Sequence, residues 1–281
     1  MGTRLVGFRG ADGATSVGRL SEDGGAVVPL ADLVAFWADP RRHLGRSSSQ
    51  RPPVRTADVV LVPPVLPGAR VICIGLNYLD HVAEGSYAAE GVPPHPTLFA
   101  RWPASLSVGD AEIPVPSDED GLDWEGEVVA YVGETLHEAT PDEALAAVVG
   151  YSTFNDVTAR RAQKLTSQWT LGKNADRSGP LGPIVPADEV GDLRDGLAVR
   201  TRVNGELVQD GRTDQMVYTV GDTLSMISRT LTLQPGDLLA TGTPSGVGYS
   251  RTPPWLLQPG DVVEVEVERL GVLRNRVVGT R

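Results

Sequence analysis

Glycine and proline interrupt this chain at intervals of about ten residues. The sequence contains 32 Gly and 22 Pro, a high content for a helical protein, because both residues disfavour helix interiors. The segments between these breaks have the length of short strands and irregular loops. We therefore expect a mainly β (α+β) fold.

The composition restricts what the chain can bind. Its 281 residues include 25 basic and 36 acidic side chains, which gives a formal net charge of −11, with four His and one Cys. Cys73 alone can form neither an intrachain disulfide nor a zinc cluster, so we expect any metal ion to be held by carboxylates. Nucleic acids and anionic membranes need a basic protein face, and we expect neither as a partner.

No segment has the pattern of a targeting signal or a membrane span. The N-terminal residues lack the basic start and apolar run of a signal peptide, and no stretch reaches the ~20 apolar residues of a spanning helix. We expect a soluble, cytoplasmic protein.

Two regions of the chain differ in the strength of their structural signals. Residues 1–65 alternate weakly apolar strands with turns and include a polar run, 41–55, that we interpret as a linker. An apolar strand at 71–74 opens the second region. We expect a small β-rich N-terminal domain with its linker at 1–65 and a larger domain at 66–281.

Local motifs in the second region predict one helix and two hairpins. A capping box that starts at Thr140 predicts a helix through residue 149. The Asn-Gly pair in 203–206 predicts a tight hairpin turn. Gln-Pro-Gly-Asp occurs twice, each time before an apolar strand, and residues 261–278 form a closing hairpin with Gly271 at its turn.

The strand expected at residues 122–133 carries two carboxylates on one face. Side chains alternate along a strand, so Glu125 and Glu127 point the same way, about 7 Å apart, among apolar neighbours. One interpretation is a half-exposed strand end with solvated acids. The other is a metal ion that bridges the two, because like charges entering an apolar region need a cation.

Asp156 is the best candidate for a third metal ligand. It lies between a β-prone run, 150–155, and a helix-compatible segment, 157–163, where it could instead be an ordinary helix N-cap. Three carboxylates without thiols select a hard divalent ion, Mg²⁺ first and Mn²⁺ second.

A calcium-binding loop competes for the same acids. With Gly121 at the sixth position of an EF-hand loop, ligand positions fall on Asp118, Asp120 and Glu127. Pro116 at the first position cannot ligate through its side chain, and the proline-containing segment before it cannot be the incoming helix. We therefore disfavour an EF-hand.

His81 and Glu84 are candidates for a general base. If a short helix follows the strand at 71–74, the two side chains lie on one helix face, where the carboxylate can orient the imidazole. The alternative is a surface His–Glu pair. The scarcity of His and the position after a strand end favour activation of a water molecule.

The chain has only two lysines, Lys164 and Lys173. Lys173 is expected in a glycine-flanked loop, where a solvated lysine is the default interpretation. A chain that otherwise uses Arg favours instead a role that requires a compact ammonium group. Lys164 is equally rare but lacks the loop context. The Gly-rich loop at 241–248 lacks the ending of a phosphate loop, although its amides and hydroxyls could hold a small carboxylate.

Seven motifs, taken in order, resemble the fumarylacetoacetate hydrolase family. The similarity runs from about residue 70 to the C-terminus. The motifs are Gly75-Leu-Asn-Tyr-Leu-Asp-His-Val-Ala-Glu84, Pro96-Thr-Leu-Phe99, Trp124-Glu-Gly-Glu127, Phe154-Asn-Asp-Val-Thr-Ala-Arg160, Trp169-Thr-Leu-Gly-Lys173, Val203-Asn-Gly-Glu206 and Thr241-Gly-Thr-Pro-Ser-Gly-Val-Gly248.

The resemblance implies a homodimer whose catalytic domain is a mixed β-sandwich roll. It implies that a divalent metal, Mg²⁺ or Mn²⁺, is held by Glu125, Glu127 and Asp156. It assigns catalytic roles to His81, Glu84 and Lys173, and binding of the substrate's 2-oxo acid end to Arg160, Gln163 and Thr243. Leu76 departs from the family pattern, since many members carry Arg there.

The reaction expected from this resemblance is metal-dependent hydrolysis of a carbon–carbon bond in a 2,4-dioxo acid. His81, oriented by Glu84, deprotonates a water that adds to the distal carbonyl, and cleavage expels a pyruvate enolate stabilised by the metal and Lys173. Decarboxylation of oxaloacetate and isomerisation of a 2-hydroxy-dienedioate use the same enolate chemistry and remain alternatives. A non-catalytic metal- or ligand-binding module is a further alternative. Residues 85–96 are expected to form a flexible cover.

Overall fold

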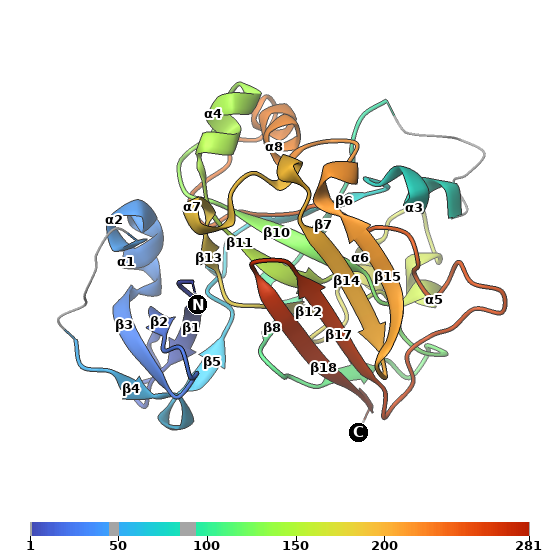
Figure 1. The fold of residues 1–281 in the computed structure, drawn as a ribbon, viewed down its shortest axis with the longest axis horizontal. Helices are drawn as coiled ribbons and strands as arrows, with labels where there is room; N and C mark the ends of the chain where they lie inside the picture. Colours follow the sequence, from blue (N-terminus) through green and yellow to red (C-terminus); the bar gives the residue numbers. More distant parts are fainter. Residues whose placement is uncertain (1, 45–50, 85–93, 281) are drawn as a thin grey trace.

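The structure, a computed structural model, describes residues 2–44, 51–84 and 94–280. The described strands form three sheets (Figure 1). The five-stranded N-terminal sheet, on the left of Figure 1, has the order β4-β3-β2-β1-β5 and antiparallel pairing throughout. Its strands are β1 (Leu5–Arg9), β2 (Thr15–Leu20), β3 (Ala26–Asp32), β4 (Val54–Arg55) and β5 (Val60–Val62).

A mixed eight-stranded sheet forms the centre of the molecule, in the order β7-β6-β16-β10-β11-β12-β8, with β13 paired to β11. β6 runs parallel to β16, and β8 runs parallel to β12. The strands are β6 (Val71–Gly75), β7 (Thr97–Arg101), β8 (Leu106–Val108), β10 (Gly126–Val132), β11 (Val148–Asn155), β12 (Gly179–Leu181), β13 (Val185–Pro186) and β16 (Leu238–Ala240).

The third sheet is five-stranded, with the order β15-β14-β17-β18-β9. Two hairpins supply four of its strands, and β9 joins the edge parallel to β18. The strands are β9 (Ile113–Val115), β14 (Ala198–Val203), β15 (Glu206–Arg212), β17 (Val262–Val267) and β18 (Gly271–Gly279).

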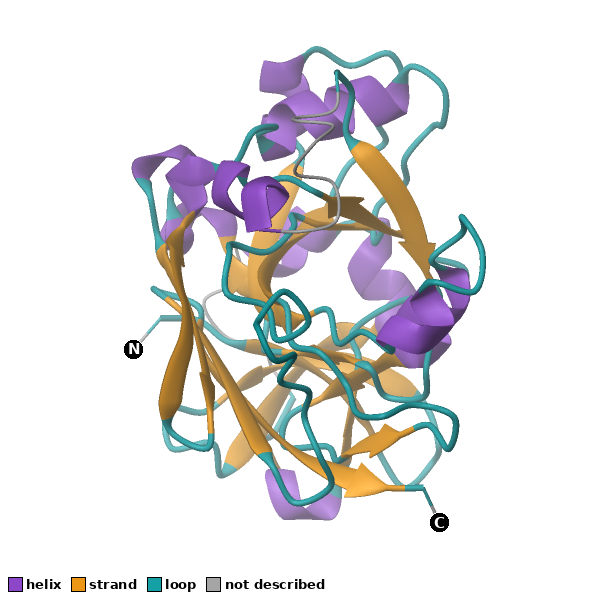
Figure 2. Ribbon diagram, turned by 90° about the vertical axis from the view of Figure 1, so that its right-hand side faces the viewer, coloured by secondary structure: helices purple, strands orange, loops and turns teal. Residues whose placement is uncertain are grey.

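The helices are short and lie mostly at the periphery of the strands (Figure 2). The α-helices are α1 (Leu33–Ala38), α2 (Pro40–Leu44), α3 (Leu79–Glu84), α4 (Pro141–Ala146), α5 (Arg160–Gln163), α6 (Thr170–Lys173), α7 (Ala187–Val190) and α8 (Val220–Ser228). Single 3₁₀ turns are η1 (Thr56–Asp58), η2 (Pro103–Ser105), η3 (Leu193–Asp195) and η4 (Thr213–Gln215). In the described part of the chain, no helix has the length and apolarity needed to span a membrane.

β10 is buried on both faces and lies between two hydrophobic cores. Its β-branched and aromatic residues suit a strand that is covered on both sides. Val128 and Ala130 join the core that contains Val265 of the third sheet. Val129 and Tyr131 join a different core. Because the faces alternate along the strand, a shift of register by one residue would exchange the two cores.

The N-terminal sheet is attached to the central sheet through α1. Trp37 is 2% exposed, and its ring stacks on that of Tyr131 with 5.9 Å between centroids. The Trp37 indole also donates a hydrogen bond to the Pro64 carbonyl at 2.8 Å. A buried aromatic pair with its polar atom satisfied is a strong contact between two layers.

The mainly β fold is confirmed, as are several local predictions. β14 and β15 pair across the Asn204-Gly205 turn. β17 and β18 pair as the closing hairpin, in which Gly271 begins the return strand with a φ of +98°. The capping box is present, since Thr140 accepts from the Glu143 amide and the Glu143 side chain accepts from the Thr140 amide.

Three boundaries were predicted wrongly. The helix that starts after Thr140 ends at Ala146, because the β-branched Val148 and Val149 enter β11 instead. The strand expected at 122–133 begins only at Gly126. The polar run 41–55 is not simply a linker, since α2 occupies its start and β4 pairs with β3 at its end.

The division of the chain near residue 65 stays a prediction. The strands of the first sheet all lie between Leu5 and Val62, and the central sheet begins with β6 at Val71.

Candidate active site

Four strand ends bring the candidate residues to one end of the central sheet. β10 begins at Gly126, opposite Asn155 at the end of β11. β16 is antiparallel to β10 and parallel to β6. The segments that follow β6, β11 and β16 therefore leave the sheet at the end where β10 enters it. These segments carry His81, Asp156 and Thr243, while Glu125 and Glu127 flank the start of β10.

Glu125, Glu127 and Asp156 form a buried cluster at this end. One carboxylate oxygen from each residue lies within 4.8 Å of the other two. All three side chains are buried, so the interpretation of the two Glu residues as solvated acids is wrong. Asp156 is not a helix cap either, because α5 begins at Arg160 with Ala159 at its N-cap.

Backbone contacts fix the positions of these carboxylates. The Glu125 amide donates to the Asn155 side chain at 3.0 Å, and the Glu125 carbonyl accepts from the Asp156 amide at 2.9 Å. The Glu127 carboxylate accepts from the Gly242 amide at 3.0 Å. Two strands and the Gly-rich loop thus hold the cluster in place before any ligand enters.

Lys173 neutralises part of the cluster from within. Its Nζ lies 2.6 Å from Glu125 Oε2 and 2.6 Å from Asp156 Oδ2, and the side chain is 2% exposed. The solvated interpretation of Lys173 is therefore wrong. The predicted loop is also wrong in detail, because Lys173 is the last residue of α6. Burial lowers the pKa of Lys173, but the charges of Asp156 and Glu125 outweigh burial and raise it.

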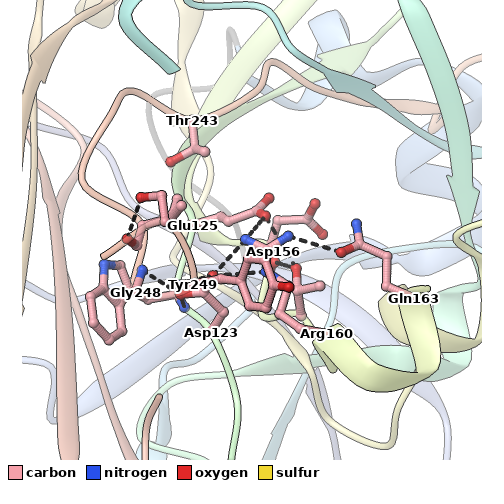
Figure 3. Close-up of polar contacts among 12 residues, drawn as sticks. Asp123, Glu125, Asp156, Arg160, Gln163, Thr243, Gly248 and Tyr249 are labelled. Carbon is pink, nitrogen blue, oxygen red and sulfur yellow. Dashed lines mark hydrogen bonds and ion pairs between the residues drawn. The ribbon is translucent and has the colours of Figure 1, made fainter. Parts of the chain in front are cut away.

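Two arginines complete the charge distribution. Arg101 is fully buried, pairs with Asp156 through Nε and donates to the Val157 carbonyl at 2.7 Å. Arg160 contacts Asp123 at 2.6 Å and Glu125 at 2.7 Å (Figure 3). The buried group contains four carboxylates and three cations, and so has one excess negative charge when all four carboxylates are ionised. The carboxylates are those of Asp123, Glu125, Glu127 and Asp156, and the cations are Arg101, Arg160 and Lys173.

The pKa values of the two Glu residues shift in opposite directions. Burial raises the pKa of Glu125, but the positive charges of Lys173 and Arg160 outweigh it and bring the pKa to about 2. Burial, reinforced by the charges of Asp156 and Glu125, raises the pKa of Glu127 well above its usual range. Glu127 is therefore the carboxylate whose charge is least compensated by the protein.

The donor set fits a hard divalent cation. Glu125, Glu127 and Asp156 offer only carboxylate oxygens, and Mg²⁺ and Mn²⁺ prefer such ligands. A divalent ion would compensate the ionised Glu127 and leave the buried group with one excess positive charge. The charge of the buried group thus favours binding of a divalent cation, and the net positive charge that results would attract an anionic ligand.

A cavity of about 450 Å³ opens beside the cluster. His81, Glu125, Arg160, Gln163 and Lys173 line it, which brings together five of the predicted site residues. Arg160 also donates to the Gln163 amide oxygen at 3.0 Å (Figure 3). The His81 imidazole lies close enough to Glu125 to contribute to the lowered pKa of that carboxyl. Ligand pockets of about 300–1,000 Å³ are typical for small molecules.

Two predictions about the segment after β6 extend beyond the described residues. The helix expected there is present as α3, and it contains both His81 and Glu84. The Glu84 side chain lies outside the description, as do residues 85–93 of the expected cover. The pairing of His81 with Glu84 and the motion of the cover stay predictions.

Thr243 lies beside the cluster but is not among the residues that line the cavity. Its hydroxyl donates to the Gly126 carbonyl at 2.9 Å and accepts from Gln209 Nε2 at 2.8 Å. These bonds fasten the Gly-rich loop to the start of β10. The predicted substrate contact of Thr243 stays a prediction.

The sequence interpretation missed Asp123, which joins two walls of the cavity. Its carboxylate contacts Arg160 and accepts from the amides of Gly248 at 2.7 Å and Tyr249 at 3.1 Å (Figure 3). Its position two residues before Glu125 is the signal that could have identified it. Arg101 was also missed, because nothing local separates it from any other arginine at a strand end.

The calcium-loop alternative is wrong. The segment before Gly121 contains β9 instead of an incoming helix. The backbone carbonyl of Asp118 accepts from Arg161 at 3.0 Å, and that of Asp120 accepts from Gln258 at 2.7 Å. Among the described residues, the acidic groups close enough to share a metal ion are those of the buried cluster.

Comparisons with known proteins agree with this architecture. The chain is 35% identical over 295 residues to the mitochondrial oxaloacetate tautomerase fahd2 of Xenopus laevis, covering 98% of this chain and 90% of the relative. A solved fumarylacetoacetate hydrolase from Exiguobacterium antarcticum is 36% identical, with a TM-score of 0.81, covering 99% and 100% of the two chains.

A fumarylpyruvate hydrolase from Pseudomonas aeruginosa, solved in complex with Mn²⁺ and pyruvate, is 33% identical. Its TM-score is 0.69, and the match covers 79% of this chain and 92% of that one. The family model for the fumarylacetoacetate (FAA) hydrolase C-terminal domain matches residues 70–278. The chain therefore belongs to the fumarylacetoacetate hydrolase family of enzymes.

Proposed function

We propose that this protein catalyses the metal-dependent keto–enol tautomerisation of oxaloacetate or a closely related 2-oxo acid. The observation that carries the proposal is the buried cluster of Glu125, Glu127 and Asp156, with Lys173 between two of its members, at the base of a cationic cavity. Relatives named as oxaloacetate tautomerases support this choice of reaction.

Each residue has a role in moving one proton. Mg²⁺ or Mn²⁺, held by the three carboxylates, would supply Lewis-acid polarisation of the substrate's 2-oxo group. Arg160 and Gln163 bind and orient the adjacent carboxylate in the cavity. His81 accepts the proton from carbon 3. Lys173 stabilises the negative charge that develops on the 2-oxo oxygen. Transfer of the proton from His81 to this oxygen gives the enol and returns His81 to its neutral form.

The test is the rate at which oxaloacetate equilibrates between keto and enol forms, followed by the ultraviolet absorbance of the enol. We expect acceleration that requires Mg²⁺ or Mn²⁺ and disappears in Glu125→Gln. Product analysis with acylpyruvates, oxaloacetate and dienoic 2-hydroxy acids separates tautomerisation from hydrolysis, decarboxylation and isomerisation. If the metal-loaded protein leaves the equilibration rate unchanged, the proposal is wrong.

Hydrolysis of a 2,4-dioxo acid is the second candidate. His81 lies in the cavity wall near Glu125, where an imidazole could deprotonate a water molecule. The solved fumarylpyruvate hydrolase supports this reaction class. His81→Ala should then remove hydrolysis of acylpyruvates while leaving metal affinity nearly intact. Hydrolysis at the wild-type rate in this variant would exclude His81 as the base.

The remaining predictions concern the state of the whole protein. A homodimer and a cytoplasmic location are our proposals, and light scattering together with localisation of the tagged chain would test them. A non-catalytic binding module would show tight metal binding without turnover of any 2-oxo acid in the panel.

A further inference from the structure

The outer half of the cavity carries positive charges that the proposed reaction does not use. Lys164 and Arg251 line the cavity together with Tyr249, beyond the inner group of Arg160 and Lys173. Glu125 is the one carboxylate among the described lining residues, against four Lys and Arg side chains. Such a surface attracts anions and raises their local concentration.

The inner cations are already paired, whereas the outer ones are not. Arg160 and Lys173 each contact two carboxylates at 2.6–2.7 Å. The Lys164 ammonium meets the Tyr249 hydroxyl, its Nζ lies 3.7 Å from the centroid of that ring, and no described carboxylate pairs with it. The full charge of Lys164 is therefore available to a ligand.

Arg251 is held in place without losing its charge. Its Nη2 donates to the carbonyls of Val208 at 3.0 Å and Gly246 at 3.2 Å. The guanidinium also lies 5.7 Å from the Trp124 ring and 5.4 Å from the Trp255 ring. No described carboxylate pairs with it, so these contacts orient a cation instead of neutralising it.

The inner and outer groups are neighbours in the cavity wall. Lys164 follows α5 in a helical conformation, four residues after Arg160. Residues four apart on a helix lie on one face with about 5–6 Å between Cβ atoms. The Tyr249 ring lies between them, 6.0 Å from the Arg160 guanidinium and 3.7 Å from Lys164 Nζ.

We infer that Lys164 and Arg251 form a subsite for the second carboxylate of a dicarboxylic 2-oxo acid. The inference rests on the proposed function, because the first carboxylate must lie at the inner group. The subsite favours dicarboxylic over monocarboxylic 2-oxo acids of the same length.

The test measures affinity for two five-carbon acids by calorimetry on the Mg²⁺-loaded protein. 2-Oxoglutarate carries the second carboxylate, and 2-oxopentanoate has a methyl group in its place. We expect the wild-type protein to bind the diacid about 10-fold more tightly, since one charge-assisted hydrogen bond is worth about a factor of ten or more.

Substitutions of Lys164 test whether the preference for the diacid comes from the subsite. Lys164→Met keeps the length of an exposed side chain and removes its charge, so it should weaken 2-oxoglutarate binding about 10-fold and change 2-oxopentanoate binding by less than about 2-fold. Lys164→Glu should weaken diacid binding further, and Lys164→Arg should retain it. Arg161→Met is the matched control, because Arg161 is exposed and does not line the cavity.

Two results overturn the inference while leaving the proposed function in place. One is equal wild-type affinity for the two acids. The other is an equal effect of Lys164→Met on both acids. Binding of neither acid also overturns the inference, while the proposed function is judged separately by the rate of oxaloacetate equilibration.

Discussion

Lys173 is the residue on which the charge balance of the site depends. It is buried and bridges Glu125 and Asp156, so the cluster exists as a compensated group before a metal ion binds. The scarcity of lysine in the sequence drew attention equally to both lysines. Only the structure separated Lys173 from Lys164, which is equally rare and lies exposed at the outer end of the cavity.

Replacement of Lys173 by Met should impair both stability and turnover. The loss of one partner from a buried ion pair costs about 3–5 kcal/mol of unfolding free energy. Turnover should fall about 100- to 1,000-fold, the usual effect of removing one electrostatic stabiliser. Denaturant unfolding without metal and steady-state assays with Mg²⁺ measure the two effects.

The double variant Lys173→Met with Glu125→Gln provides the control. It removes one positive and one negative charge, so its stability should recover relative to the single variant while activity stays absent. A Lys173→Met protein as stable as the wild type would contradict the buried bridge.

Glu127 should couple metal binding to pH. Burial and the charges of Asp156 and Glu125 raise its pKa, so the metal-free protein keeps Glu127 protonated at pH values where a free Glu is ionised. A metal ion binds the ionised form, so binding releases a proton and weakens as the pH falls through the raised pKa. Calorimetry in two buffers with different ionisation enthalpies counts this proton. Absence of proton release below neutral pH would contradict the raised pKa.

At the scale of elements, the site depends on the loop after β16. Gly242 has a φ of +88°, and its amide donates to Glu127. A Cβ at this position would lie 2.9 Å from Asn77 Cβ and 3.2 Å from the Ile74 carbonyl oxygen. Glycine is therefore required both by the backbone conformation and by the close approach of the segment after β6.

Gly242→Ala should destabilise the protein and weaken metal binding together. The left-handed conformation alone costs about 1–2 kcal/mol for a residue with a Cβ, and the crowding at Asn77 displaces the amide that holds Glu127. Gly205→Ala is the matched control, because Gly205 has a φ of +86° in a distant hairpin with open space around it. It should lose similar stability and keep wild-type metal affinity. Equal metal affinity in both variants would exclude the role of Gly242 at Glu127.

At the scale of the whole molecule, the N-terminal sheet covers one face of the strand that carries Glu127. Trp37 of α1 stacks on Tyr131, which lies on the same face of β10 as Glu127. The same hydrophobic core includes Phe154, two residues before Asp156. Packing of the N-terminal sheet therefore supports the strands that position two of the proposed metal ligands.

Trp37→Ala should cost about 3–5 kcal/mol of unfolding free energy, as expected for loss of a large buried aromatic side chain. Val34→Ala is the control on the same helix, because Val34 is 72% exposed and its truncation should change stability by less than about 0.5 kcal/mol. Urea unfolding followed by circular dichroism measures both variants. Equal midpoints would show that Trp37 does not hold the two sheets together.

Some properties followed from the sequence because their causes are local. Glycine and proline spacing set the strand lengths, the Thr140 capping box started a helix, and the Asn204-Gly205 pair set a hairpin turn. The carboxylate character of the candidate metal site was also readable, since a chain with one Cys and four His offers few nitrogen or sulfur ligands. Element ends were less predictable, because pairing in the sheet overrode helix propensity at Val148.

Tertiary structure alone decided how these parts are combined. The pairing of β6, β16, β10 and β11 brings together residues from His81 to Thr243. Burial, which one sequence does not show, separated the candidate metal ligands from solvated acids and gave opposite pKa shifts to Glu125 and Glu127. Arg101, Asp123 and Arg251 gained their roles only through contacts with residues distant in the chain. The physical reason is that electrostatic energy depends on distances and solvent exposure, which the fold sets and the order of residues does not.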